Sequence, residues 1–158
     1  MKSLKRVLSL FVVLALSMGI GVYAQNPSAV SIAMSELEKK YEDTEGVDCV
    51  TLTKGNGLDM MKMMLNKELG RSFMKGVTSI TLIDYSEASA QVRKSLGEEL
   101  EAITSMLEEF DTGEKKGAAR GFASTADIDA GKLSDFLIVI ENDDSKTVMY
   151  MAGEIVLK

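Results

Sequence analysis

Methionine is the residue type whose number and spacing in this chain could most readily do chemistry. The sequence contains 11 methionines, and Met60, Met61, Met63 and Met64 fall within one short stretch. Thioether sulfurs are soft ligands that suit Cu(I), and a spacing of three or four residues on a helix brings two sulfurs together. The chain has no histidine to complete such a site. Copper carriage therefore stays an alternative to core packing and to an adaptable protein-binding surface.

The packing interpretation makes a definite prediction for this helix. A period of 3.6 residues buries Met61 and Met64 together with Leu65 and leaves the other two methionines partly outside. Two further methionines share one face of the last predicted strand. The candidate partner-binding surface consists of Met60, Met63, Met149 and Met151.

Acidic residues at two places hint at a calcium site without completing one. Asp127, Asp129 and Gly131, with Asp135 beyond them, begin like a calcium loop, but an EF-hand needs glycine at the sixth position and glutamate at the twelfth. Here glycine stands at the fifth position and isoleucine at the twelfth. The segment 142–145 is also acidic, and its short polar side chains predict a hairpin turn. We therefore predict no metal site and no cofactor.

The sequence offers no catalytic constellation either. Its carboxylates gather on the outer face of a predicted amphipathic helix, where solvation explains them, and serine or threonine nucleophiles lack a histidine base. The glycines of 113–117 lack the spacing and the ending of a phosphate-binding loop. The single cysteine, Cys49, lies in a strand-like run and is expected to be a buried apolar thiol. We predict that the protein is not an enzyme.

The first 24 residues have the pattern of a secretory signal peptide. Lys2, Lys5 and Arg6 precede an apolar run, which ends in the small-residue pattern before Gln25. The predicted products are a signal peptide, 1–24, and a single exported domain, 25–158, located in the periplasm or at the cell surface. No cysteine follows the cleavage point, so lipid attachment is not indicated, and no stable membrane insertion is expected after cleavage.

The net charge of the predicted exported domain limits the kinds of partner that it can bind. The signal contains three of the 18 basic residues and none of the 24 acidic ones, which leaves a net charge of −9. A field of that sign repels phosphate backbones and anionic lipid surfaces, so nucleic-acid binding is not expected.

Periodicity predicts an α+β domain with the order α-β-α-β-α-β-β-β. Asn26, Asn56 and Ser86 are the predicted helix starts, and the last helix is expected to include Phe110. The strands are predicted at 47–54, 77–85, 118–127, 133–141 and 147–157. The last three form an antiparallel meander, and the first two, separated by a helix, could be parallel. We expect a mixed, largely antiparallel sheet of about five strands with about three helices on one face, the other face being more polar or covered by a partner.

From Asn56 onward the chain resembles an uncharacterised family of small exported proteins from Gram-negative bacteria. The resemblance rests on the segments 58–65, 80–83 and 133–140, on Asp143 with Asp144, and on the closing run 149–155. It implies export and a compact α+β domain of unknown function, and it implies no catalytic residues.

Two functional hypotheses remain open on the sequence. The leading one is a non-enzymatic interaction module of the bacterial envelope, with another envelope protein as its partner. The alternative is a periplasmic carrier of a small ligand or of a copper or calcium ion.

Overall fold

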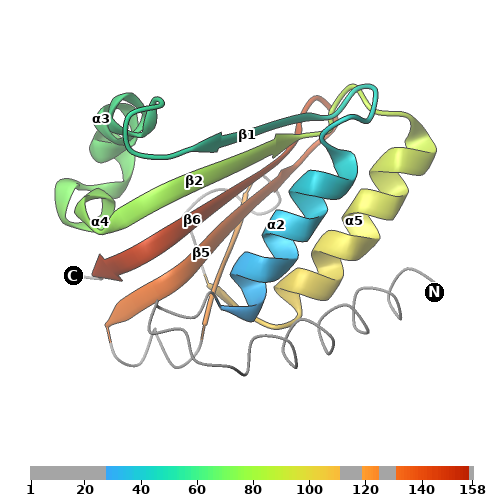
Figure 1. Cartoon of the computed structure of the whole chain (residues 1–158). Helices are drawn as coiled ribbons and strands as arrows, with labels where there is room; N and C mark the ends of the chain where they lie inside the picture. Colours follow the sequence, from blue (N-terminus) through green and yellow to red (C-terminus); the bar gives the residue numbers. More distant parts are fainter. Residues whose placement is uncertain (1–27, 111–118, 125–130, 157–158) are drawn as a thin grey trace, which may run out of the picture.

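A six-stranded antiparallel sheet in the order β1-β2-β6-β5-β4-β3 organises the protein (Figure 1). The computed structural model describes residues 28–110, 119–124 and 131–156. The strands are β1 (Asp48–Leu52), β2 (Val77–Asp84), β3 (Glu108–Phe110), β4 (Arg120–Ala123), β5 (Lys132–Glu141) and β6 (Lys146–Val156). The helices are α2 (Ala29–Tyr41), α3 (Leu58–Leu69), α4 (Arg71–Lys75) and α5 (Ala90–Thr104).

Helices α2 and α5 lie side by side along one face of the sheet (Figure 1). Apolar residues at helical spacing point inward from both, and they meet the alternate strand residues that face this side. Leu96 of α5 and Ile83 of β2 are completely buried in this cluster. Its helical members are Val30, Ala33, Met34, Leu37, Tyr41, Leu96, Leu100 and Ile103. This side of the sheet forms the larger part of the core.

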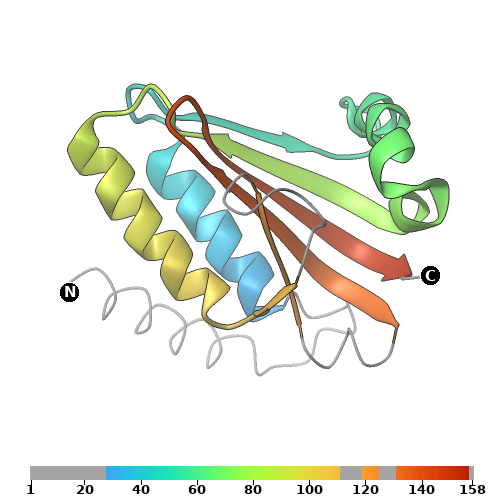
Figure 2. The same ribbon diagram turned by 180° about the vertical axis from the view of Figure 1, so that it is seen from behind.

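Helices α3 and α4 occupy the opposite face, at one end of the sheet (Figure 2). Leu58 of α3 and Met74 of α4 are buried there against Ile80, Phe136 and Met151, which point away from α2 and α5. The two faces therefore have separate apolar clusters. We expected the second face to be more polar or covered by a partner, but the chain partly covers it with α3 and α4.

The α+β class is confirmed, while the sheet is antiparallel throughout rather than mixed. β1 and β2 pair antiparallel because α3 and α4 stay at one end of the sheet, so the chain re-enters beside the strand it has just left. The meander of β4, β5 and β6 is confirmed. A sixth strand, β3, pairs with β4. It contains Phe110, which was wrongly predicted to continue the preceding helix.

Helix starts are the least accurate of the predictions. Ser28 caps α2, and its hydroxyl accepts a hydrogen bond from the Ser31 amide at 3.0 Å; Asn26 lies outside the described residues. Ser89, not Ser86, caps α5. Asn56 does not cap α3, since its side chain bonds the backbone of the preceding turn, and Gly57 occupies that position. A local turn therefore takes the Asn56 side chain, while the Ser86 hydroxyl accepts a hydrogen bond from the Lys146 amide at 2.8 Å.

A close backbone contact at the end of α4 joins helices α3 and α4 to the sheet. Gly76, which ends α4, accepts a 3.0 Å hydrogen bond from the amide of Glu154 in β6. A Cβ atom on Gly76 would lie 1.7 Å from the carbonyl oxygen of Glu154. Gly153 opposite has a φ of 142°, and a Cβ there would lie 2.1 Å from the oxygen of Gly76. Only glycine permits this approach.

Alanine at either of these glycines is expected to destabilise the fold. Gly76→Ala or Gly153→Ala should lower the free energy of unfolding by at least about 2 kcal/mol, because the methyl group meets backbone that cannot move aside. Gly97→Ala in α5 is the matched control. Nothing lies within 4 Å of its added Cβ, and helix propensity predicts a gain of roughly 0.5–1 kcal/mol. Urea denaturation measures all three; equal midpoints for Gly76→Ala and Gly97→Ala would contradict the close contact.

Candidate binding surfaces

Helix α3 presents three neighbouring methionines to solvent. Met60, Met63 and Met64 are 69, 68 and 64 % exposed, and they follow the spacing of one helix face. The inner face of α3 is a narrow stripe of Leu58, Met61 and Leu65. Met64 lies roughly a quarter turn around the helix axis from that stripe. The prediction that Met64 is buried is wrong, because α3 touches the sheet along this one stripe only.

The other two methionines of the candidate surface lie in the sheet. Met149 and Met151 share the face that α3 covers, as predicted, but Met151 is fully buried among the apolar residues of that face. Met151 is therefore not available to a partner. Met149 is half-buried in a row that the strand register extends from Val50 through Leu82 and Met149 to Ile138. The apolar surface thus continues from α3 onto the sheet.

Five basic residues lie in the same stretch of the chain as these methionines. Lys54, Lys67, Arg71 and Lys75 are exposed, and Lys62 of α3 is half-buried. Sequence reasoning used only the total charge of the domain and missed this local excess of cations. The signal was present as a run of basic residues within one stretch of the chain. We call the exposed methionines together with these five cations the α3–α4 surface.

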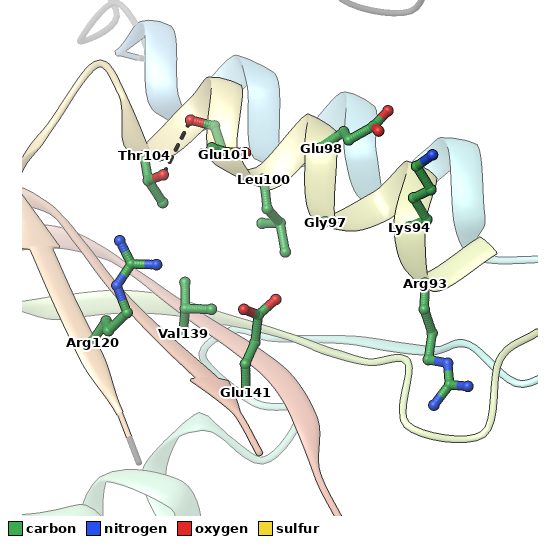
Figure 3. A pocket seen from close by; sticks show the side chains of 10 residues that line it. All are labelled: Arg93, Lys94, Gly97, Glu98, Leu100, Glu101, Thr104, Arg120, Val139 and Glu141. Atoms are coloured by element: carbon green, nitrogen blue, oxygen red, sulfur yellow. Dashed lines mark hydrogen bonds between the residues drawn. The ribbon is translucent and has the colours of Figure 1, made fainter. Parts of the chain in front are cut away.

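A second candidate is a groove on the other face of the sheet, between α5 and strands β4 and β5 (Figure 3). It has a volume of about 330 Å³, within the range of small-molecule sites. Leu100 and Val139 form its apolar part. Its charged lining residues are Arg93, Lys94, Glu98, Glu101, Arg120 and Glu141.

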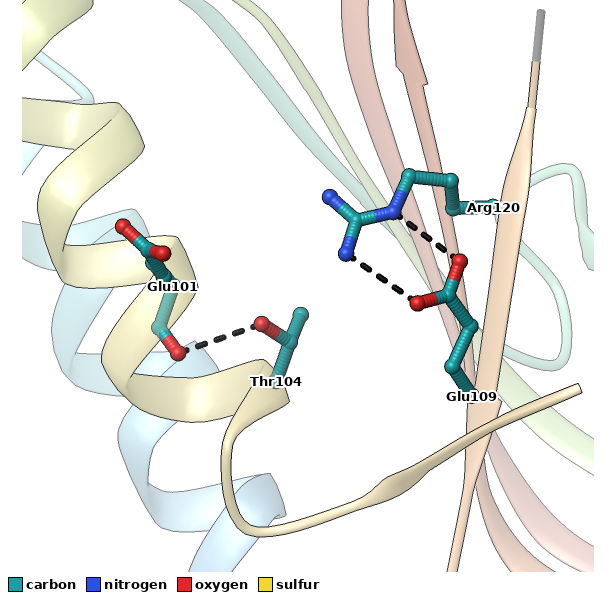
Figure 4. Close-up of polar contacts among 4 residues, drawn as sticks. All are labelled: Glu101, Thr104, Glu109 and Arg120. Atoms are coloured by element: carbon teal, nitrogen blue, oxygen red, sulfur yellow. Dashed lines mark hydrogen bonds and ion pairs between the residues drawn. The ribbon is translucent and has the colours of Figure 1, made fainter. Parts of the chain in front are cut away.

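Arg120 is held at the edge of this groove by Glu109 (Figure 4). The guanidinium donates from Nε and Nη2 to the two carboxylate oxygens at 3.1 and 3.3 Å. The bond to Arg120 lowers the pKa of Glu109, and the same contact raises the pKa of Arg120. Three cations and three carboxylates line the groove, so it has no net charge with which to attract an ion. Both Arg120 and Glu109 are half exposed, which makes this pair of small energetic value.

Carboxylates elsewhere accept hydrogen bonds from tyrosines, and two of them, those of Glu99 and Asp135, are buried. Tyr41 of α2 donates to Glu99 of α5 at 3.0 Å, and Lys40 pairs with the same carboxylate. Tyr150 donates to Asp135, which also accepts from Ser28 at 2.7 Å and thereby ties the start of α2 to β5. A third pair joins Tyr85 and Glu141 at 2.8 Å. These acids fasten helices and strands together.

The described residues of the two acidic segments are hydrogen-bonded within the protein. Asp127 and Asp129 lie outside the described residues, and Asp135 is buried with its oxygens bonded to protein hydroxyls. Asn142 accepts from the amides of Asp144 and Ser145, which is the predicted hairpin turn. Within the described ranges, no three His, Cys, Asp or Glu side chains are grouped to hold a metal ion.

Cys49 is partly buried on β1 and is not activated. Burial, and then the negative charges of Glu38, Glu42 and Asp48, raise the pKa of its thiol to about 11. At neutral pH the group is therefore a thiol, not the thiolate that acts as a nucleophile.

Comparisons with known protein families, with curated proteins and with solved structures give no match. In the part of the chain that the structure describes, no helix is long and apolar enough to cross a membrane. The α3–α4 surface and the groove beside α5 are therefore the two features from which a function can be inferred.

The tyrosine–carboxylate pairs predict how stability depends on alkaline pH. Burial, followed by the adjacent carboxylate, raises the pKa of Tyr41, Tyr85 and Tyr150 above the ordinary value of about 10. A raised folded-state pKa gives stability that is complete below the unfolded pKa and is lost as the pH rises past it.

We therefore expect the domain to unfold above about pH 10, with tyrosinate absorbance appearing together with loss of circular dichroism. Tyr85→Phe should remove part of this pH dependence, since phenylalanine does not titrate. Titration of the three tyrosines near their ordinary pKa while the domain stays folded would contradict the pairing.

Proposed function

We propose that this protein is an exported, non-enzymatic interaction module of the bacterial envelope, and that the α3–α4 surface is where it binds. The observation that carries the proposal is the exposure of Met60, Met63 and Met64 on adjacent positions of one helix. Soluble proteins rarely leave several large apolar side chains together in water unless they bind something. Methionine suits such a surface because its flexible thioether adapts to the shape of a partner.

Export is supported by the sequence of residues 1–24 alone. The charged start, apolar centre and small-residue end remain the reason to place the domain in the envelope. Another envelope component is then the natural partner. The absence of catalysis is likewise proposed from the use of the buried carboxylates of Glu99 and Asp135, which accept hydrogen bonds from tyrosine and serine hydroxyls of the fold.

A photo-crosslinking amino acid placed at Met63 tests the proposal in living cells. We expect a crosslinked adduct from this position, because its side chain is 68 % exposed at the centre of the surface. The matched control is Met106, which is 44 % exposed just after α5 and outside the α3–α4 surface. Equal yields from both positions, or adducts from Met106 alone, would contradict this surface as the site.

A Cu(I) carrier is the second candidate, and the same three methionines favour it. Their side chains are exposed, and Met60 lies three residues before Met63 and four before Met64, a spacing that can bring two sulfurs together on a Cu(I) ion. Leucine is apolar but offers no sulfur ligand, so it separates the two functions.

With the photo-crosslinking amino acid at position 63, we expect the further changes Met60→Leu and Met64→Leu to keep the crosslinking pattern of an interaction surface. If instead the protein carries copper, wild type should hold one Cu(I) in native mass spectrometry and the triple variant Met60→Leu, Met63→Leu, Met64→Leu none. Retention of copper by the leucine variant would exclude these sulfurs as ligands.

A further inference from the structure

The charges of the exported domain are segregated along the chain. The segment 54–75, which holds α3 and α4, contains five basic and two acidic residues, a net charge of +3. The rest of residues 25–158 contains ten basic and 22 acidic residues, a net charge of −12. The expectation that this acidic domain repels anionic surfaces assumed an even distribution of charge.

In the fold, the basic segment and many of the acidic residues lie at opposite ends of the sheet, so the two ends have charges of opposite sign. α3 and α4 lie where β1 ends and β2 begins, and Figures 1 and 2 show them at one end of the sheet. Asp48 at the start of β1 pairs with Asp84 at the end of β2, and the β5–β6 hairpin turns at this same far end. The acidic residues in and beside these turns are Glu42, Asp43, Glu45, Asp48, Asp84, Glu87, Glu141, Asp143 and Asp144.

Distance keeps the acidic end from cancelling the basic one. A strand of the length of β2 spans roughly 25 Å, and charges more than about 8 Å apart are largely screened at physiological salt. A surface that touches α3 and α4 therefore meets mainly their cations. The acidic end points away from it, and the molecule approaches with a defined orientation.

The cations of the α3–α4 surface are free to bind. Ion pairs in the described part of the chain use Lys40, Arg120 and Lys132 as their cations. Lys67, Arg71 and Lys75 belong to none of them and are exposed. Exposed methionines and exposed cations in one segment match the two parts of a lipid interface, the acyl chains and the phosphate headgroups.

We propose that α3 and α4 dock this protein peripherally on an anionic lipid surface. The basic side chains would contact the phosphate groups, and Met60, Met63 and Met64 would enter the boundary between headgroups and acyl chains. The inference rests on the proposed function, whose binding surface it uses, and names its partner. A lipid surface is favoured over a protein because the segment 54–75 combines a net charge of +3 with exposed methionines, which match the phosphate groups and the acyl chains of an anionic lipid layer.

Co-sedimentation with vesicles of phosphatidylethanolamine and phosphatidylglycerol tests this, with phosphatidylcholine vesicles as the neutral comparison. We expect binding to the anionic vesicles that weakens as salt rises. Lys67→Gln, Arg71→Gln and Lys75→Gln together should weaken it by about 100-fold, from roughly five-fold per neutralised cation. Met60→Ser, Met63→Ser and Met64→Ser should weaken binding at every salt concentration.

Control variants remove exposed cations and an exposed methionine from outside the α3–α4 surface. Lys39→Gln with Lys94→Gln removes exposed cations elsewhere, and Met106→Ser removes an exposed methionine elsewhere. Both should bind like wild type, and circular dichroism establishes that each variant is folded. Equal binding to neutral and anionic vesicles, equal losses in control and test variants, or no binding at all would overturn the lipid inference.

The lipid inference and the proposed function can fail separately. If crosslinking at Met63 captures a protein while wild type ignores anionic vesicles, the interaction module stands and the lipid inference falls. If neither crosslinking at Met63 nor vesicle binding is seen, both fall.

Discussion

The backbones of Gly76 and Gly153 approach so closely that neither residue can have a side chain. This contact joins the end of α4 to β6 through the hydrogen bond from Glu154, and β2 begins in the next residue. It therefore positions α4 against the sheet, and α3, which packs on α4, follows. The same constraint keeps α3 at the end of the sheet, where one narrow stripe suffices to hold it. Its methionines are left in solvent as a consequence.

On the opposite face of the sheet, polar side chains are hydrogen-bonded to one another. Tyr41, Tyr85 and Tyr150 each give their hydroxyl to a carboxylate, and Asp135 in addition receives the hydroxyl that caps α2. The bonds to Glu99 and Asp135 hold α2 against α5 and the start of α2 against β5, because a buried carboxylate without its donors would be costly. Acidic groups that might otherwise have done chemistry are engaged in packing. Structure and binding are thereby assigned to different parts of the molecule.

Much of the fold could be predicted from the sequence because the evidence is periodic and local. The inward stripes of α2 and α5, the strand ending in Glu141 and the hairpin after it follow from such patterns. The direction of β2 relative to β1 could not be predicted, since it depends on whether α3 and α4 cross the sheet or remain at one end. The short β3 is similarly defined by its pairing with β4 and not by its own three residues.

The candidate surface could be predicted only in part, because some of its residues follow from local periodicity and others depend on tertiary contacts. Exposure of Met60 and Met63 follows from helical period, and the structure confirms it. Burial of Met151 and exposure of Met64 depend on how far α3 reaches over the sheet, which is a tertiary property. The grouping of Lys67, Arg71 and Lys75 in the same stretch of the chain as the methionines was readable as local charge, but only the fold shows that the acidic turns lie at the other end.

Hydrogen exchange measured by mass spectrometry, with and without membranes isolated from the envelope, tests most directly whether α3 and α4 are the docking element. The account predicts that membranes slow exchange in the segment 54–75 and leave the acidic hairpin at 141–146 unchanged. Unchanged exchange in 54–75, or protection centred on the groove beside α5, would contradict it.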